Sequence, residues 1–302
     1  MNQTSHSKLL LILSMLIFGT IGVFRRYLDV PSGFLAMLRG AIGALLLVVV
    51  LLVSGKRLSL SNVRRNWWRL ILGGAMIGFN WIFLFESYRY TTVAVATLCY
   101  YMAPVFVMLV SPFVLGERLS RRKIVALSIA FLGIMLVSGV FSSESIGQSG
   151  GLGILYGLLA ALLYAAVIVL NKTVVGVGAS ERTVVELLSA AIVLLPYTLI
   201  FEEIGSIAFT PLTIVLLLVV GLVHTGLAYA AYFASLSHLS AATVSILSYI
   251  DPALAILLSV LFLDEPFTLS ILFGTFFILG GTLLCELPIK IPYLDAEEPS
   301  DK

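Results

Sequence analysis

The sequence predicts an all-α integral membrane protein whose ten transmembrane helices form two inverted repeats of five helices. Composition is the first reason. Hydrophobic residues make up 60% of the 302 residues and charged residues only 11%, and the mean hydropathy is +1.09. Soluble proteins carry about 25% charged residues, so most of this surface must face lipid rather than water. The second reason is an internal repeat at an offset of 148 residues.

Ten apolar segments approach the roughly 20 residues that a helix needs to cross a bilayer. They are Leu9–Phe24, Gly33–Val53, Leu70–Tyr88, Val93–Leu115, Ile124–Val140, Leu152–Leu170, Thr183–Phe201, Leu212–Leu236, Ala242–Phe262 and Leu269–Leu284. The connections between them are too short to hold a soluble catalytic or nucleic-acid-binding domain. We therefore expect a first repeat over residues 8–140, a second over residues 152–286, and a disordered cytoplasmic tail over residues 287–302.

The basic residues of the connections predict the orientation. Fourteen Lys and Arg residues fall on one side of the predicted membrane and three fall on the other, namely Arg25, Arg26 and Arg89. Lys and Arg accumulate in cytoplasmic loops. The sequence therefore predicts that both termini are cytoplasmic and that this is a multi-pass protein of the cytoplasmic (inner) membrane.

Two stretches of the chain match without a gap at an offset of 148 residues. TVAVATLCYYMAPVFVMLVSPFVLGE aligns with SAATVSILSYIDPALAILLSVLFLDE, which pairs Tyr101 with Tyr249, Pro104 with Pro252 and Glu117 with Glu265. Because five helices is an odd number, the second copy must enter the membrane upside down. Inverted repeats are typical of secondary transporters that bind substrate near the bilayer midplane. Some channels share this symmetry, but we favour a transporter.

The repeated blocks A-P-V-F…G-E-R-L and D-P-A-L…D-E-P-F, with the glycine-bearing stretches FLGIMLV and ILGGTLL, resemble the drug/metabolite transporter superfamily, in its ten-helix EamA-type branch. The resemblance implies a carrier that often exports amino acids or related metabolites and is coupled to a proton or ion gradient or runs by exchange. It implies no ATP use, and the chain has no GxxxxGK[ST] phosphate loop. Members that carry sugar phosphates or nucleotide sugars hold basic residues in their late helices, and the last two spans here hold none.

Asp251 is the most informative polar residue because it falls midway along the ninth span, where a carboxyl group is costly. Its partner in the first repeat is Ala103, so the fold itself does not require an acid there. It could carry a proton, pair with a substrate ammonium group, or bond a neighbouring helix. In continuous helices Tyr101 and Tyr249 would point about 200° away from these two positions. The sequence thus leaves open whether the acid and the tyrosines line one cavity.

Two prolines predict kinks in the fourth and ninth spans. Pro104 and Pro252 lack an N–H, and each frees the carbonyl four residues earlier, at Tyr100 and Ser248. The matched positions indicate that both kinks are part of the repeat.

Other polar and aromatic residues at depth are candidates for substrate contact. His224 is either a neutral imidazole bonded to a backbone carbonyl or a proton relay with Asp251. Arg39 binds a substrate carboxylate, pairs with an acid or snorkels outward. Glu186 is a weaker candidate for a gate, and Glu86 should pair with a nearby arginine at the rim. The remaining candidates, which could wall a cavity, are Asn80, Trp81, Tyr100, Tyr101, Tyr164, Tyr229 and Tyr249.

Together these features predict a secondary transporter for an amino acid, a related zwitterionic or cationic metabolite, or a drug-like analogue. Efflux by alternating access is the expected mode. A membrane-embedded enzyme acting on lipid and a channel are the alternatives. We expect no catalytic residues, metal, cofactor or nucleic-acid partner, because the acids and histidines are scattered singly.

Overall fold

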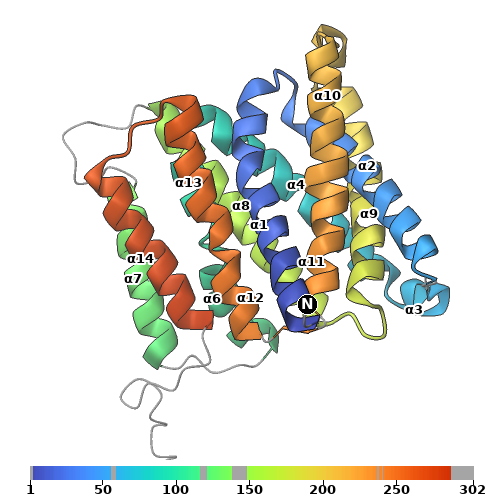
Figure 1. Cartoon of the computed structure of the whole chain (residues 1–302), viewed down its shortest axis with the longest axis horizontal. Coiled ribbons are helices and arrows are strands. Elements are labelled where there is room, and N and C mark those ends of the chain that lie inside the picture. Colours follow the sequence, from blue (N-terminus) through green and yellow to red (C-terminus); the bar gives the residue numbers. More distant parts are fainter. Residues whose placement is uncertain are drawn as a thin grey trace, which may run out of the picture.

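The computed structural model describes residues 3–55, 59–115, 121–137, 148–236, 238–239 and 241–286, and these residues form helices and connections without a strand. The first half contains α1 (Gln3–Tyr27), α2 (Ser32–Val53), the short α3 (Leu60–Arg65), α4 (Trp67–Tyr90), α5 (Val93–Tyr100), α6 (Ala103–Leu115) and α7 (Arg121–Val137). The helices stand side by side as a single bundle (Figure 1).

The second half repeats this order. It contains α8 (Gln148–Lys172), α9 (Ala179–Phe201), the 3₁₀ turn η1 (Ile204–Ser206), α10 (Pro211–Val219), the π-helical η2 (Val220–Leu227), α11 (Ala228–Leu236), α12 (Ala241–Ser248), α13 (Ile250–Leu263) and α14 (Leu269–Glu286). The predicted tail, residues 287–302, lies outside the described residues, as do residues 138–147 between the halves.

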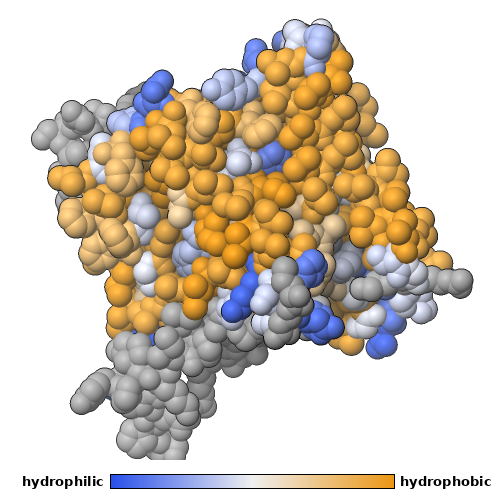
Figure 2. All heavy atoms as spheres, in the orientation of Figure 1, coloured by the Kyte–Doolittle hydropathy of each residue, from blue (hydrophilic) through white to orange (hydrophobic). Residues whose placement is uncertain are grey.

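Apolar helices long enough to cross a bilayer make up most of the described chain. Eight helices of at least 18 residues meet that requirement, and α7 and α14 add the shorter apolar stretches Ile124–Val137 and Leu269–Leu284. Figure 2 shows an apolar surface over the body of the bundle, with hydrophilic side chains gathered toward its upper and lower edges. The prediction of an all-helical, multi-pass membrane fold is confirmed.

The helix contacts follow the symmetry of an inverted repeat. In the second repeat, the eighth and ninth spans, through α11 and α13, pack on α1. In the first repeat, the corresponding third and fourth spans, which are α4 and α5/α6, pack on α8, the repeat mate of α1. Two helices pack directly against their own repeat mates: α2 contacts α9, and α7 contacts α14. In the second of these pairs Gly133 and Gly281, which are repeat mates, let the backbones touch. A Cβ on either glycine would lie 2.8 Å from a backbone atom of the facing helix.

Three of the predicted spans are not regular α-helices throughout, and two of them break where Pro104 and Pro252 predict kinks. The fourth span breaks between α5 and α6 at Tyr101, and the ninth breaks between α12 and α13 at Tyr249. The proline rings three residues further on, at Pro104 and Pro252, prevent regular helix across these positions. The eighth span contains the π-helical segment η2, where the Thr225 side-chain hydroxyl donates to the carbonyl of Val220, five residues earlier. Hydropathy patterns carry no signal for such a segment.

One carboxylate joins the two halves near a helix end. Glu265, which follows α13, accepts hydrogen bonds from the Val93 N–H at 2.9 and 2.8 Å and pairs with Arg26 at 3.1 Å. The Val93 N–H, together with that of Ala94, which donates to the same carboxylate at 3.4 Å, lies at the start of α5 and has no partner within its own helix. Glu265 therefore positions the first half of the broken fourth span. Its repeat mate Glu117 lies outside the described residues.

Candidate functional site

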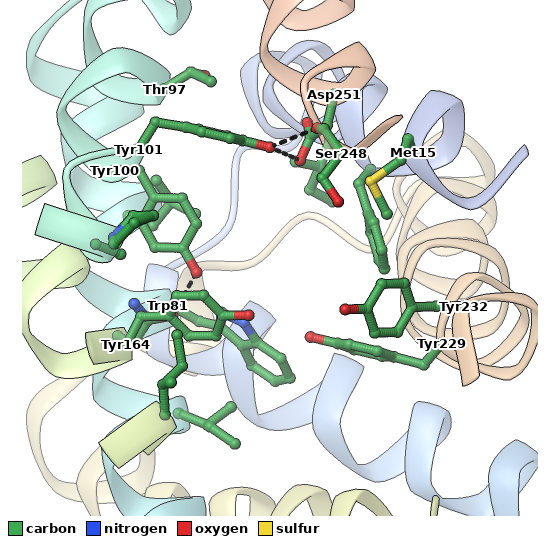
Figure 3. Close-up of a pocket in the computed structure, with 18 of the residues that line it drawn as sticks. Met15, Trp81, Thr97, Tyr100, Tyr101, Tyr164, Tyr229, Tyr232, Ser248 and Asp251 are labelled. Atoms are coloured by element: carbon green, nitrogen blue, oxygen red, sulfur yellow. Dashed lines mark hydrogen bonds between the residues drawn. The ribbon is translucent and has the colours of Figure 1, made fainter. Parts of the chain in front are cut away.

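A cavity of about 330 Å³ lies between the two halves of the bundle, within the range of about 300–1,000 Å³ typical of small-molecule sites. Both repeats contribute to its lining. The first repeat contributes residues of α1, α2 and α4, and the second contributes residues of α8, α11 and α13. Aromatic side chains dominate the walls (Figure 3), and they are Phe18, Trp81, Tyr88, Tyr100, Tyr101, Tyr164, Tyr229 and Tyr232.

Asp251 forms the acidic end of the cavity. The Tyr101 hydroxyl donates a hydrogen bond to its Oδ2 at 3.0 Å and also contacts the carbonyl oxygen of Ser248 at 3.2 Å (Figure 3). That carbonyl is the one that Pro252 deprives of its helical donor. The acid and Tyr101 therefore share one cavity, because the break at Tyr101 turns this side chain away from the direction that a continuous helix would give it.

Arg39 forms the basic end of the cavity, on α2. Its Nε donates to the Thr225 hydroxyl at 3.0 Å, and its guanidinium carbon lies 4.1 Å from the ring centroid of Trp81. The residue is 5% exposed. In the described part of the chain no acid pairs with Arg39 and no base pairs with Asp251. An acidic and a basic side chain thus line one cavity without forming an ion pair with each other.

The tyrosines between these ends form an ordered wall. Tyr100 stacks on Tyr164 with ring centroids 5.6 Å apart, and Tyr229 meets Phe18 edge-on at 5.4 Å. Figure 3 shows the hydroxyl ends of Tyr164, Tyr229 and Tyr232 directed toward the centre of the cavity. The wall offers both ring faces and hydroxyl groups to a bound molecule.

Residues 7–139 and 151–286 match the EamA-like transporter family. The chain belongs to this family. A Bacillus subtilis (strain 168) protein named as the uncharacterized transporter YxxF is 33% identical over 261 residues, which span 86% of this chain and 83% of that protein. A solved crystal structure superposes with a TM-score of 0.64 at 20% identity and covers 93% of this chain and 96% of its own, which shows the shared fold.

A more distant relative has a described cargo. The pseudopaline exporter CntI of Pseudomonas aeruginosa (strain UCBPP-PA14) is 29% identical over 131 residues, which span 43% of this chain and 45% of that protein. Family and relatives identify the chain as a membrane transporter of small molecules, and the resemblance to the EamA-type drug/metabolite transporters is confirmed.

Most of the residues that the sequence singled out lie together in this EamA-like transporter. The cavity lining includes Asp251, Arg39, Asn80, Trp81, Tyr100, Tyr101, Tyr164, Tyr229 and Pro104. Asn80 also ties two helices together, because its amide donates to the Ala160 carbonyl at 2.5 Å while its oxygen meets the Tyr100 hydroxyl at 3.5 Å. Whether these residues bind substrate stays a prediction, but the fold does bring them to one place.

Five of the singled-out residues lie outside the lining, namely His224, Tyr249, Pro252, Glu186 and Glu86. His224 sits in η2 with both ring nitrogens partnered, Nε2 to the Thr20 hydroxyl at 2.7 Å and Nδ1 to the Val219 carbonyl at 3.4 Å. This arrangement matches a structural imidazole rather than a relay with Asp251. The Tyr249 hydroxyl donates to Thr282 at 2.7 Å, and its ring packs against that of Tyr101 with centroids 6.1 Å apart without lining the cavity itself. Pro252 is buried and is not part of the cavity lining.

Several lining residues carry no signal in the hydropathy pattern. Met15 and Phe18 come from the first span, Tyr88 from the end of the third, and Thr97 and Tyr232 from opposite repeats. Thr97 stands out because its buried hydroxyl oxygen has no hydrogen-bond partner. Its spacing of four residues from Tyr101 was the only available hint, since residues i and i+4 share a helix face.

Among the described residues, no three of the His, Cys, Asp and Glu side chains are grouped closely enough to hold a metal. Cys99 is buried and is not in a disulfide. At the rim Glu86 and Arg89 form the expected ion pair at 3.1 Å. The arrangement of the cavity is suited to recognising a small molecule by charge and ring contacts.

Proposed function

We propose that this protein is a secondary transporter that binds a small zwitterion, an amino acid or a close relative, in the central cavity. It would export this substrate across the cytoplasmic (inner) membrane by alternating access. The single observation that carries the proposal is the pair of opposite, mutually unpaired charges, Asp251 and Arg39, in one aromatic cavity.

Electrostatics favours a substrate with both charges. A buried charge without a counterion is costly, and one zwitterion can compensate two such charges at once. The planar guanidinium of Arg39 suits a carboxylate, which it can bind through two parallel hydrogen bonds. Asp251 and the tyrosine faces suit an ammonium group. A phosphate would be matched by one arginine only and opposed by Asp251.

Direction and mechanism rest on the repeat and on one relative. The pseudopaline exporter gives a precedent for efflux among proteins that share part of this sequence. The symmetric contacts of the two halves support alternating access, because each half can take up the conformation of the other.

The test starts with metabolites. Extracellular and intracellular pools are compared between cells that overproduce the wild type, Asp251→Asn, Arg39→Gln and, as a matched control, Tyr249→Phe, which lies outside the cavity. We expect the wild type and the control to shift one class of amino acid-like compounds outward, and the two cavity variants to shift them weakly or not at all.

Purified protein in proteoliposomes then defines the chemical class. For a compound found in that screen, the decarboxylated amine and the N-acetylated acid should compete poorly with the parent zwitterion. Arg39→Gln should abolish the preference for the parent over the amine, and Asp251→Asn should abolish the preference for the parent over the acylated acid. Equal competition by all three compounds in the wild type would contradict a zwitterion site. Non-saturating flux would favour a channel.

A further inference from the structure

A second arginine lies buried at the end of the bundle where α1 ends and α2 begins. Arg25 is 4% exposed. Its guanidinium group donates to the Leu28 carbonyl at 2.5 Å and to the Ser32 hydroxyl at 3.1 Å, while its Nε, which is also buried, has no hydrogen-bond partner. Among the described residues no acid forms an ion pair with it. A fixed, buried cation with one free donor therefore lies at this end of the bundle.

Arg25 continues the line of side chains with which α1 faces the cavity. Ile21 lines the cavity, and Arg25 follows it by four residues, which places it on the same face one turn further along. On α4, Trp81 and Tyr88 line the cavity, and Phe85 falls between them on their shared face. Arg25 and Phe85 thus lie where the cavity would lengthen toward the α1–α2 end of the bundle.

Phe85 separates this second arginine from the first. Its side chain is fully buried, and its ring centroid lies 6.0 Å from the guanidinium carbon of Arg25 and 5.5 Å from that of Arg39. The repeat mate of this residue, Phe233, stacks on Tyr229 at 6.0 Å instead. The ring is therefore common to both repeats, whereas two cations against one ring are a feature of the first repeat.

We propose that Arg25 is a second carboxylate-binding residue on the path between the cavity and the α1–α2 end of the bundle, and that Phe85 is the gate between the two arginines. The substrate carboxylate would pass from Arg39 to Arg25 when the ring moves aside. The identity of the substrate rests on the proposed function.

The hydrogen bonds around Arg25 leave it able to bind such a group. The Ser32 hydroxyl accepts from Arg25 and donates to the Glu86 carboxylate at 2.5 Å, and Arg89 donates to the same carboxylate at 3.1 Å. Glu86 is thus held by Ser32 and Arg89, and the Nε–H of Arg25 stays free. A bond from this donor to a carboxylate is charge-assisted, which makes it stronger than a neutral one.

Thiol labelling in sealed vesicles tests the path without any substrate. Cys99 and Cys285 are replaced by alanine, and Ser248, which lines the cavity, is replaced by cysteine. Membrane-impermeant methanethiosulfonates, one with a sulfonate and one with a trimethylammonium group, are added outside. Gly205→Cys identifies vesicles with the correct orientation, because this residue is exposed in open space just beyond Glu202, which bonds the first N–H groups of α2.

The ratio of the anionic to the cationic labelling rate measures the charge along the path. We expect Arg25→Gln to lower this ratio about tenfold, because the loss of one positive charge slows the anion and speeds the cation. Arg89→Gln is the matched control, since it removes the same charge from an exposed position at the same end of the bundle, where solvent and salt screen it. An unchanged ratio in Arg25→Gln, or an equal fall in the control, would overturn the proposal.

The gate is tested in the same assay. Phe85→Ala should raise the labelling rates of both reagents, because it removes the ring between the two arginines. Phe85→Leu keeps an apolar side chain of similar bulk and should label about as slowly as the parent. Rates that stay low in Phe85→Ala, or that rise equally in both variants, would overturn the gate.

Transport then tests the step itself, with a compound identified in the metabolite comparison. Arg25→Gln should lower kcat for the parent zwitterion about tenfold or more, with little change in its KM at the cavity, and should leave transport of the matching amine unchanged. Arg25→Lys should recover part of the loss. Ser32→Ala breaks the bond that ties Arg25 to the α1–α2 turn but keeps the guanidinium group. It should therefore retain the preference for the zwitterion.

A purely structural role of Arg25 predicts a different result. Arg25→Gln and Ser32→Ala would then reduce transport of the zwitterion and of the amine alike, which would overturn the proposal and leave the transporter assignment intact. If the wild type moves no compound, the proposed function fails, while the labelling ratio still decides whether Arg25 draws anions into the path.

Discussion

The two broken spans are repeat mates with the same backbone and different chemistry. Each has a helix break near a tyrosine, with a proline three residues further on, and the breaks fall in matching register at α5/α6 and α12/α13. Yet Tyr101 turns its hydroxyl to Asp251, while Tyr249 bonds Thr282. The position matching Asp251 holds Ala103, which also lines the cavity but brings no charge.

This difference separates what the fold needs from what the function needs. Both repeats need a break, because both halves must build the same bundle upside down relative to each other. Only one of them carries an acid, so the cavity is asymmetric even though the scaffold is symmetric. An asymmetric substrate, with a carboxylate at one end and an ammonium group at the other, matches such a site.

The largest expected effect comes from moving the acid between the repeats. Asp251→Asn should lower kcat/KM for a zwitterion about 30-fold or more, because removing one partner of a buried charge pair costs about 2–5 kcal/mol. Adding Ala103→Asp to that variant should not restore transport, since the acid would then stand in the wrong half. Proteoliposome uptake measures both variants. Recovery in the double variant would show that the two repeats are interchangeable here.

Arg39 tests the other end of the cavity. Arg39→Gln should lower kcat/KM about 10- to 150-fold, because a charge-assisted hydrogen bond contributes about 1.5–3 kcal/mol. Arg39→Lys should recover only part of this loss, since an ammonium group lacks the planar fork that binds a carboxylate and stacks on Trp81. Competition by the matching amine, which has no carboxylate, should be unaffected in both variants. A general loss of competition would indicate misfolding instead.

The matched tyrosines give a smaller and sharper contrast. Tyr101→Phe removes one hydrogen bond to Asp251 and should lower kcat/KM about 2- to 10-fold, because a neutral hydrogen bond contributes about 0.5–1.5 kcal/mol. Tyr249→Phe should leave the transport constants unchanged and lower the melting temperature, because its bond to Thr282 joins two helices outside the cavity. Uptake kinetics and thermal unfolding in detergent, measured side by side, separate the two roles. A transport defect in Tyr249→Phe with normal transport in Tyr101→Phe would mean that substrate contacts Tyr249 instead of Tyr101.

The prolines should give the smallest effects. Pro104 and Pro252 both lie in the first turn of a helix, where proline is well tolerated. Replacing either by alanine should change the free energy of unfolding by about 1 kcal/mol or less. Because only Pro104 lines the cavity, Pro104→Ala alone should alter KM measurably. An equal change in KM for both variants would mean that the breaks act through backbone flexibility.

The sequence by itself determined the helical architecture and how deep in the membrane each candidate polar residue lies. Hydropathy set the spans, the offset of 148 residues set the inverted repeat, and the cost of burying charge singled out Asp251 and Arg39. The same reasoning singled out His224, which the structure places against Thr20 rather than in the cavity. Hydropathy and charge report how deep a residue lies but not which neighbour its helix face meets.

Only the tertiary structure decided which side chains share the cavity. The helix break at Tyr101 turns its ring toward Asp251, and no regular helical spacing carries through such a break. Met15, Thr97 and Tyr232 reach the cavity from three different spans, through contacts far apart in the chain. The unpartnered Nε of Arg25 became visible for the same reason, because the absence of an acceptor depends on every helix packed around it.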